Sequence, residues 1–261
     1  MKHKTKVILT TVAGVAVIGG AGLGVAQWQY HSSLKTTAVQ VKQAKTKIVA
    51  NKDLTKTQEQ TSVKYGNSGG GLNIPNSATL KKYANSSEIV YGRGYVAVPA
   101  QKGVTQPISS LAINEGSSNK VLAIGAGTVQ PGAVMGQGNF TIAAHNFGNN
   151  VTYFSPMQNS IDVDATPKAY LTDGKKIYVY QFNKTTDDVS GRRVVSYKKG
   201  SVANVNNTLD GKAMLTMITC DEPGIFTLHP DNRLVLTGHL VSEHSVDKAT
   251  ASEEALFPQV F

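Results

Sequence analysis

The chain has one cysteine, Cys220, and it stands where an apolar run ends. The pattern of residues 215–220 is typical of a β-strand, and Asp221-Glu222-Pro223-Gly224 then breaks the run. One cysteine excludes an intramolecular disulfide and any multi-cysteine metal cluster. A thiol at a strand end can act as a nucleophile. The alternative is an inert core residue, because free cysteine is among the most buried residue types.

A nucleophilic Cys220 needs a proton acceptor nearby, because thiolate is the reactive form of the side chain. His145 is the best placed histidine, since it follows the apolar run 140–144 and therefore also stands at a strand end. His229 and His239 are less well placed, and a lone histidine is more often an ordinary surface or core residue. His145 is therefore the candidate general base.

Attack of a thiol on a carbonyl creates an oxyanion, which a cation or hydrogen-bond donors must stabilise. Arg233 opens the predicted strand 233–241, whose other residues carry no charge. Alternatively, Arg233 is an ordinary solvent-facing residue at a strand end and has no role in the chemistry. Asp221 and Glu222 disfavour thiolate through like charge, so a cation beside Cys220 is especially needed.

The first thirty residues predict a membrane segment. Residues 1–6 contain three lysines, and residues 7–26 contain no charged side chain. A helix of this length spans roughly 30 Å, the hydrocarbon thickness of a bilayer. The lysines predict a cytoplasmic N-terminus and an exported, single-pass protein of the cell membrane. Gly24-Val25-Ala26 would permit a cleaved signal peptide instead, but the apolar run exceeds the about 7–15 residues usual for one.

We assign residues 27–88 to a polar linker and residues 89–261 to the folded body. The linker is rich in Lys, Gln, Thr, Ser and Asn, and buries too little apolar surface to offset the entropy of ordering. The net charge of +9 lies entirely before residue 91, because residues 91–261 carry 14 basic and 14 acidic residues. The basic character is therefore poor evidence for nucleic-acid binding, and we expect no nucleic-acid partner.

The body has the composition of a mostly-β domain, a barrel or a sandwich. Asp173-Gly174 lies between two β-rich runs, 169–172 and 175–180, which predicts a hairpin with a type I′ turn. Residues 119–125 and 150–158 could form short helices. The other predicted strands are 89–98, 108–113, 140–144, 176–182, 193–197, 213–220 and 233–241.

Three short motifs resemble those of the sortases, which are cysteine transpeptidases of Gram-positive bacteria. Their order along the chain, histidine then cysteine then arginine, also matches the family. Thr216-Met217-Ile218-Thr219-Cys220 resembles the family's TLxTC signature, with Met217 in place of Leu. Ala144-His145-Asn146 resembles its histidine motif, and Arg233-Leu234-Val235 resembles its arginine strand. The predicted anchor, linker and β body resemble the class A, housekeeping members.

The resemblance implies a closed eight-stranded β-barrel and transpeptidation at a C-terminal Leu-Pro-x-Thr-Gly sorting signal of surface proteins. Cys220 would attack the Thr carbonyl and release the Gly-containing tail. His145 would move the protons, and Arg233 would bind the substrate backbone and the oxyanion. An amine of the peptidoglycan precursor would then resolve the thioester.

The resemblance also suggests a set of groove and oxyanion residues. Thr219 and the backbone N–H after Cys220 are candidates for assisting at the oxyanion. The residues expected to bind the sorting signal are Thr219, Thr216, Ile218, Ala143, Ala144 and Val235. Some class A members bind calcium through carboxylates before the histidine strand, but residues 116–161 contain no Asp or Glu. We therefore expect no metal site, no cofactor and no calcium activation.

Three other functions remain open. A specialised, pilin-type sortase usually carries a lid and a C-terminal membrane span, and residues 252–261 are too short and charged for a span. A cysteine hydrolase of the cell wall would need no Thr-Gly bond. A non-catalytic, membrane-tethered β domain that binds wall polymers fits the same composition, and Cys220, His145 and Arg233 alone argue against it.

Overall fold

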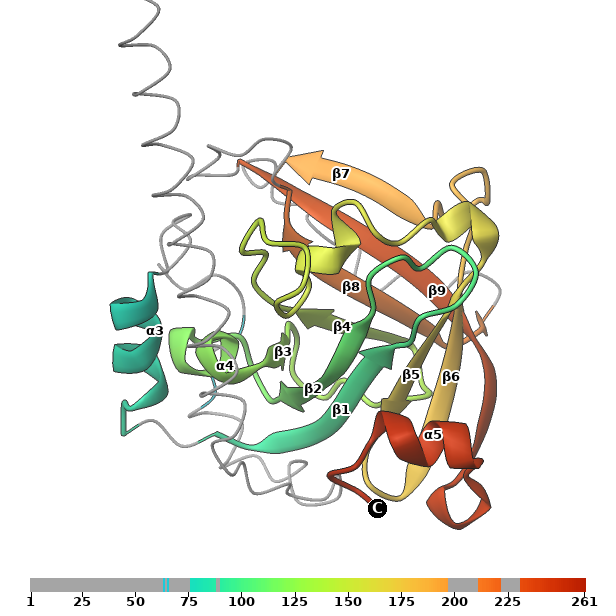
Figure 1. Ribbon diagram of the computed structural model, residues 1–261, viewed down its shortest axis with the longest axis horizontal. Coiled ribbons are helices and arrows are strands. Elements are labelled where there is room, and N and C mark those ends of the chain that lie inside the picture. The colour runs from blue at the N-terminus through green and yellow to red at the C-terminus, as the bar shows by residue number, and fades with distance from the viewer. Residues whose placement is uncertain (1–62, 64, 66–75, 88–89, 197–210, 222–230) are drawn as a thin grey trace, which may run out of the picture.

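The computed structural model describes residues 63, 65, 76–87, 90–196, 211–221 and 231–261. These residues form a nine-stranded sheet in the order β6-β5-β1-β2-β3-β4-β8-β9-β7 (Figure 1). Because β6 also pairs with β9, eight of the nine strands close into a barrel, and β7 extends the N-terminal half of β9. The closed, mostly-β barrel confirms the predicted fold class.

The bounds of the strands agree well with the apolar runs of the sequence. Only β3, a short Ala-Gly-Thr strand, had no counterpart among the predicted strands, and β9 runs past the predicted end at residue 241. The strands are β1 (Gly92–Val98), β2 (Ile108–Asn114), β3 (Ala126–Thr128), β4 (Asn139–Ala143), β5 (Lys168–Thr172), β6 (Lys176–Phe182), β7 (Arg192–Ser196), β8 (Met214–Cys220) and β9 (Asn232–Ser245).

The helices are short, and α3 (Ser77–Ala84), α4 (Asn119–Ile124) and η1 (Ser155–Met157) each contribute a residue to the core cluster. The predicted helix 119–125 is present as α4, but the predicted helix 150–158 is reduced to a single 3-10 turn, η1. Asn150 and Tyr153 adopt positive φ values of 58° and 51°, which no α-helix accommodates. The remaining helices are η2 (Val163–Ala165), η5 (Val246–Lys248) and α5 (Ala251–Leu256).

Alternation along the strands divides the barrel wall into an inner and an outer face. On β8, Leu215 and Met217 point into the core and are fully buried. Thr216, Ile218 and Cys220 therefore lie on the outer face. Met217, which replaces the family's Leu, occupies an apolar core position where the two side chains are similar in volume.

The predicted hairpin at Asp173-Gly174 is present, but its turn differs from the prediction. Thr172 pairs with Ile177, so the loop is longer than two residues. Only Gly174 of the two has a positive φ, at 84°, whereas a type I′ turn needs positive φ at both central positions. The Asp173 carboxylate instead accepts bonds from the N–H groups of Lys175 and Lys176 and closes the loop.

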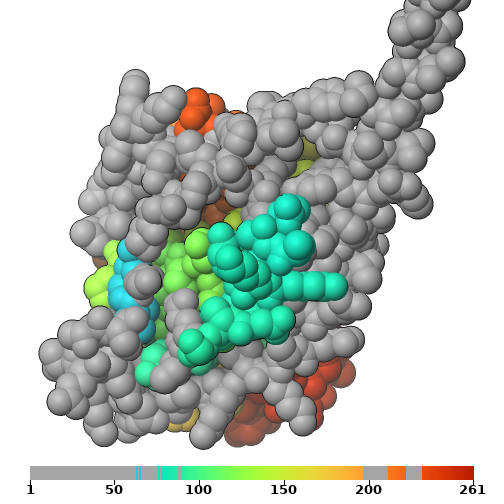
Figure 2. Space-filling model, turned by 90° about the vertical axis from the view of Figure 1, so that its left-hand side faces the viewer, coloured from blue at the N-terminus to red at the C-terminus, as the bar shows by residue number. Residues whose placement is uncertain are grey.

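The folded body begins earlier than the predicted boundary at residue 89. Helix α3 lies within the range assigned to the linker, and its Leu80 is fully buried in the core cluster. The helix packs against α4, and Figure 2 looks onto this side of the molecule. Leu80 and the partly buried Tyr83 are too few apolar residues in this polar stretch to give a periodic signal, so the sequence placed α3 in the linker.

The predicted membrane segment 7–26 lies outside the described residues, as does most of the linker. Within the ranges that the structure describes, no helix is both long enough and apolar enough to cross a bilayer.

Candidate active site

The ends of three neighbouring strands bring Cys220, His145 and Arg233 to one level of the sheet. Strand β8 is antiparallel to β9, and Cys220 pairs directly with Arg233. Strand β4 is parallel to β8, with Ala143 opposite Ile218, and the Ala144 N–H donates to the Ile218 carbonyl at 3.1 Å. Two residues farther along both strands, His145 therefore reaches the level of Cys220.

All three side chains lie on the outer face of the sheet. Cross-strand partners share a face, so the direct pair Cys220 and Arg233 points the same way. His145 is two residues beyond Ala143, which lies beside Ile218 on that face. Cys220, His145 and Arg233 are each partly exposed, whereas Ile218, Thr219 and Leu234 beside them are buried. A nucleophile, an imidazole and a guanidinium thus meet at an accessible place.

The surroundings of His145 favour its neutral form. His145 keeps some exposed surface, but the surrounding protein desolvates its ring. This desolvation, followed by the positive charge of Arg233, lowers the pKa of His145 from 6.5 to about 4. The ring lies 5.4 Å from the Phe147 ring, centroid to centroid, and the His145 carbonyl accepts a bond from the Phe154 N–H at 3.2 Å. At neutral pH this imidazole is therefore unprotonated and able to accept a proton.

The two auxiliary oxyanion donors considered from the sequence are both engaged elsewhere. The Asp221 N–H, which follows Cys220, donates to the Asn232 carbonyl at 3.1 Å. Thr219 is buried and its hydroxyl donates to the Ala144 carbonyl at 2.8 Å. Arg233 pairs with Cys220 and lies on the same face of the sheet as the thiol, and its Nη1 donates to the Asn232 carbonyl at 3.0 Å.

The expected groove residues divide between the two faces of the sheet. Ala143, Ile218 and Val235 form one cross-strand row directly beneath the three candidate catalytic residues. Thr216 lies in the next row, and its hydroxyl donates to the Asn139 side chain at 2.8 Å. Ala144 and Thr219 lie on the opposite, core side.

A polar network beside Cys220 was not anticipated from the sequence. Asn146 is 1% exposed, and its side-chain amide donates to the Cys220 carbonyl and to Gln158 Oε1, both at 3.1 Å. The Gln158 amide in turn donates to the Asp221 carboxylate at 2.9 Å. The only sequence signal for this network was that Asn146 directly follows His145.

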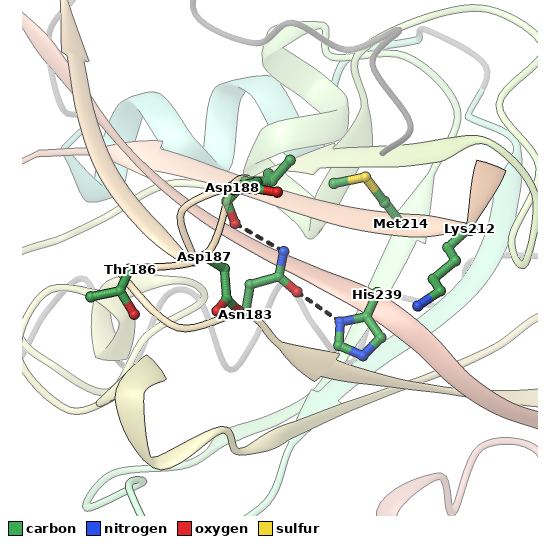
Figure 3. A pocket seen from close by; sticks show the side chains of 8 residues that line it. Asn183, Thr186, Asp187, Asp188, Lys212, Met214 and His239 are labelled. Atoms are coloured by element: carbon green, nitrogen blue, oxygen red, sulfur yellow. Dashed lines mark hydrogen bonds between the residues drawn. The ribbon is translucent and has the colours of Figure 1, made fainter. Parts of the chain in front are cut away.

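A second polar region lies at the opposite end of β8. A cavity of about 440 Å³ is bordered by the β6–β7 connection, the start of β8 and His239 of β9 (Figure 3). Asn183 stands between these parts: its Oδ1 lies 2.7 Å from His239 Nδ1, and its amide donates to the Val189 carbonyl. Cys220 lies six positions after Met214 on β8, which corresponds to roughly 20 Å along the strand. His239 is therefore remote from the thiol.

Metal ligands do not gather anywhere in the described ranges: no three His, Cys, Asp or Glu side chains there are arranged to hold an ion. Residues at the candidate site offer one thiol, one imidazole and one cation. This set suits covalent acyl transfer by a cysteine.

The chain is similar to known proteins along much of its length. Sortase A of Listeria monocytogenes is 27% identical over 187 residues, which cover 72% of each chain. Sortase A of Streptococcus agalactiae is 28% identical over 56% of this chain and 53% of its own. The solved structure of the Listeria enzyme aligns with 64% of this chain and 97% of that chain, at 27% identity and a TM-score of 0.49.

The family model described as "Sortase domain" matches residues 96–241, more than half of the chain and the range that holds Cys220, His145 and Arg233. The chain belongs to the sortase family of cysteine transpeptidases.

Proposed function

We propose that this sortase is a membrane-anchored, class A transpeptidase that attaches surface proteins to the cell wall. Its substrate would be a C-terminal Leu-Pro-x-Thr-Gly sorting signal, and its acceptor an amine of the peptidoglycan precursor. The meeting of Cys220, His145 and Arg233 at one level of the sheet carries the proposal. Relatives named Sortase A support the assignment to class A.

In the first step, the Cys220 sulfur attacks the Thr carbonyl of the sorting signal. The thiol proton passes to His145, which is neutral before the reaction because its pKa is about 4. The tetrahedral intermediate then collapses, the Thr–Gly bond breaks, and His145 returns the proton to the leaving Gly amine. A thioester between Cys220 and the Thr acyl group remains.

In the second step, an acceptor amine resolves the thioester. His145 takes a proton from the incoming amine, the new amide bond forms, and the Cys220 thiolate leaves and regains a proton. Arg233 would stabilise the oxyanion in both steps. Its Nη1 donates to the Asn232 carbonyl at 3.0 Å, and a guanidinium carries five N–H donors and a permanent positive charge. The low pKa of His145 means that the imidazolium is short-lived.

Residues 7–26 would hold the enzyme in the membrane, with residues 1–6 in the cytoplasm and the barrel outside. This orientation would place the site near exported substrates and the cell-wall precursor. We expect no dependence on calcium or on any cofactor, because residues 116–161 offer no carboxylate.

The test is transfer by the full-length chain in detergent micelles. A quenched Leu-Pro-x-Thr-Gly peptide, with x varied, is mixed with triglycine as the amine. We expect cleavage between Thr and Gly and a Thr–triglycine product, both absent in Cys220→Ala. Cleavage without transfer would indicate a hydrolase, and no cleavage of any peptide would favour a wall-binding domain. A large loss of rate with a calcium chelator would contradict calcium independence.

A further inference from the structure

We infer that Asn146 is a positioning residue of the active site, which fixes the Cys220 backbone to the segment that carries His145. The inference rests on the proposed roles of Cys220 and His145. Asn146 comes from the loop after β4, whereas Cys220 ends β8, so one side chain joins the ends of the two strands at the level of their candidate catalytic residues.

Every polar atom of the Asn146 side chain has a partner. Its two amide hydrogens serve the Cys220 carbonyl and Gln158 Oε1, each at 3.1 Å. Its Oδ1 accepts a bond from the Gly148 N–H at 2.9 Å. A buried amide satisfied on both sides has one orientation, because rotation by half a turn would place oxygen against oxygen.

The peptide group that follows Cys220 is thereby held at both ends. Its carbonyl accepts from Asn146, and its N–H, that of Asp221, donates to the Asn232 carbonyl at 3.1 Å. The position of the Cys220 Cα is thus set by Asn146 on one side and by β9 on the other. Because Asn146 directly follows His145, a single short segment sets the spacing of thiol and imidazole.

Gln158 extends this link to a third strand. Its amide donates to the Asp221 carboxylate at 2.9 Å, and its backbone carbonyl accepts from Arg192 of β7 at 2.8 Å. Arg192 also donates to the Met157 carbonyl at 2.7 Å. The hydrogen bonds from Asn146 to Gln158 and from Gln158 to Asp221 therefore form a continuous series, which helps to fix the orientation of the Asn146 amide.

Asn149 provides a matched control in the same loop. Its side chain also makes three bonds: Nδ2 donates to Thr152 Oγ1, and Oδ1 accepts the N–H groups of Val151 and Thr152. None of these bonds reaches Cys220. Asn149→Ala thus measures the cost of loosening the loop, and Asn146→Ala adds the loss of the link to the Cys220 carbonyl.

The experiment compares full-length Asn146→Ala, Asn146→Asp and Asn149→Ala with the parent chain. Three readouts are taken: thermal unfolding, kcat and KM for peptide transfer, and the pH profile of Cys220 alkylation by iodoacetamide. For Asn146→Ala we expect kcat to fall about 10- to 100-fold with KM within threefold, since small misplacements of reacting groups have effects of this size. Asn146→Asp should move the alkylation midpoint to higher pH, because a carboxylate then faces Cys220.

Equal kcat in Asn146→Ala and the parent, or an equal loss in Asn149→Ala, would overturn the inference. If Asn146→Ala fails to fold, Gln158→Leu, which changes a partly exposed residue, is measured instead. We then expect a smaller loss of kcat, and an unchanged kcat would contradict the inference. The alkylation profile needs no sorting signal. If the parent transfers no peptide, the proposed function fails, while an unshifted alkylation profile in Asn146→Asp would refute the positioning role separately.

Discussion

The two ends of β8 present different chemistry on the same face of the sheet. At one end Cys220 pairs with Arg233 and lies level with His145. At the other end Met214 pairs with His239, whose ring is hydrogen-bonded to Asn183. Both ends have a histidine, and only one has a thiol and a guanidinium at the same level.

The comparison shows that a histidine on the outer face does not by itself make a site. His239 faces an amide partner and a polar cavity about 20 Å from the thiol by strand length (Figure 3). His145 instead lies against protein and beside Arg233, and both effects lower its pKa to about 4. The register of three strands, rather than any single residue type, defines the candidate site.

The largest expected contrast is between the two histidines. His145→Ala should lower kcat about 10²- to 10⁴-fold, the usual contribution of a general acid–base group. His239→Ala should leave kcat within about threefold, because its ring is remote from Cys220. Peptide-transfer kinetics at saturating substrate measure both, with melting curves to verify folding. Comparable losses in the two variants would break the distinction between the ends of β8.

A smaller effect is expected when the cation is changed. Arg233→Gln should lower kcat roughly 10²- to 10³-fold, as removal of an oxyanion donor does. Arg193, one row farther along β7, donates to the Thr237 hydroxyl at 3.2 Å and offers the matched control Arg193→Gln. The kcat of Arg193→Gln should change little, and any effect should fall on KM, because Arg193 pairs with Val235 of the expected groove row. An Arg233→Gln enzyme as fast as the parent would remove the guanidinium from the mechanism.

The low pKa of His145 predicts a moderate acid sensitivity of the fold. The folded pKa of about 4 lies below the unfolded value of 6.5, so between these values the unfolded chain binds a proton that the folded chain does not. Stability should therefore decrease as the pH falls from 6.5 towards 4. Urea unfolding midpoints measured across this range should fall less steeply in His145→Gln than in the parent. Parallel curves for the two chains would contradict the depressed pKa.

The smallest effect is expected in the cavity at the far end of β8. Asp187 and Asp188 border it, and the Asp187 carboxylate accepts a bond from the Lys184 N–H at 2.7 Å. Asp187→Asn and Asp188→Asn should leave kcat and KM for the five-residue sorting signal within about twofold, because the cavity lies too far from Cys220. A clear rise in KM would show that the signal reaches this end of the sheet.

The strands and the candidate catalytic residues could be predicted because both depend on local patterns. Apolar runs of β8 and β9 alternate with period two, and Cys220, His145 and Arg233 each stand at the edge of such a run. The barrel closure agrees with the resemblance to sortases, whose motifs lie in the same order.

The parts that could not be predicted depend on contacts between distant residues. Asn146 and the Cys220 carbonyl are 74 positions apart, so no local pattern links them. Residues 150–158 looked helical, but Asn150 and Tyr153 take positive φ values. The Tyr153 hydroxyl donates to the Ala123 carbonyl at 2.7 Å, and this tertiary bond helps to hold the loop in that shape. Leu80 likewise reveals its role only through packing against the barrel.

The central claim is that Cys220, positioned between His145 and Arg233, forms a thioester with the Thr of a sorting signal. Its most direct test is the intact mass of the full-length chain after mixing with a Leu-Pro-x-Thr-Gly peptide in the absence of an amine. We predict an added mass equal to the acyl fragment that ends in Thr, located on Cys220 by peptide mapping and removed by triglycine. Cleavage of the peptide without any adduct on Cys220, or an adduct that persists in Cys220→Ala, would contradict the account.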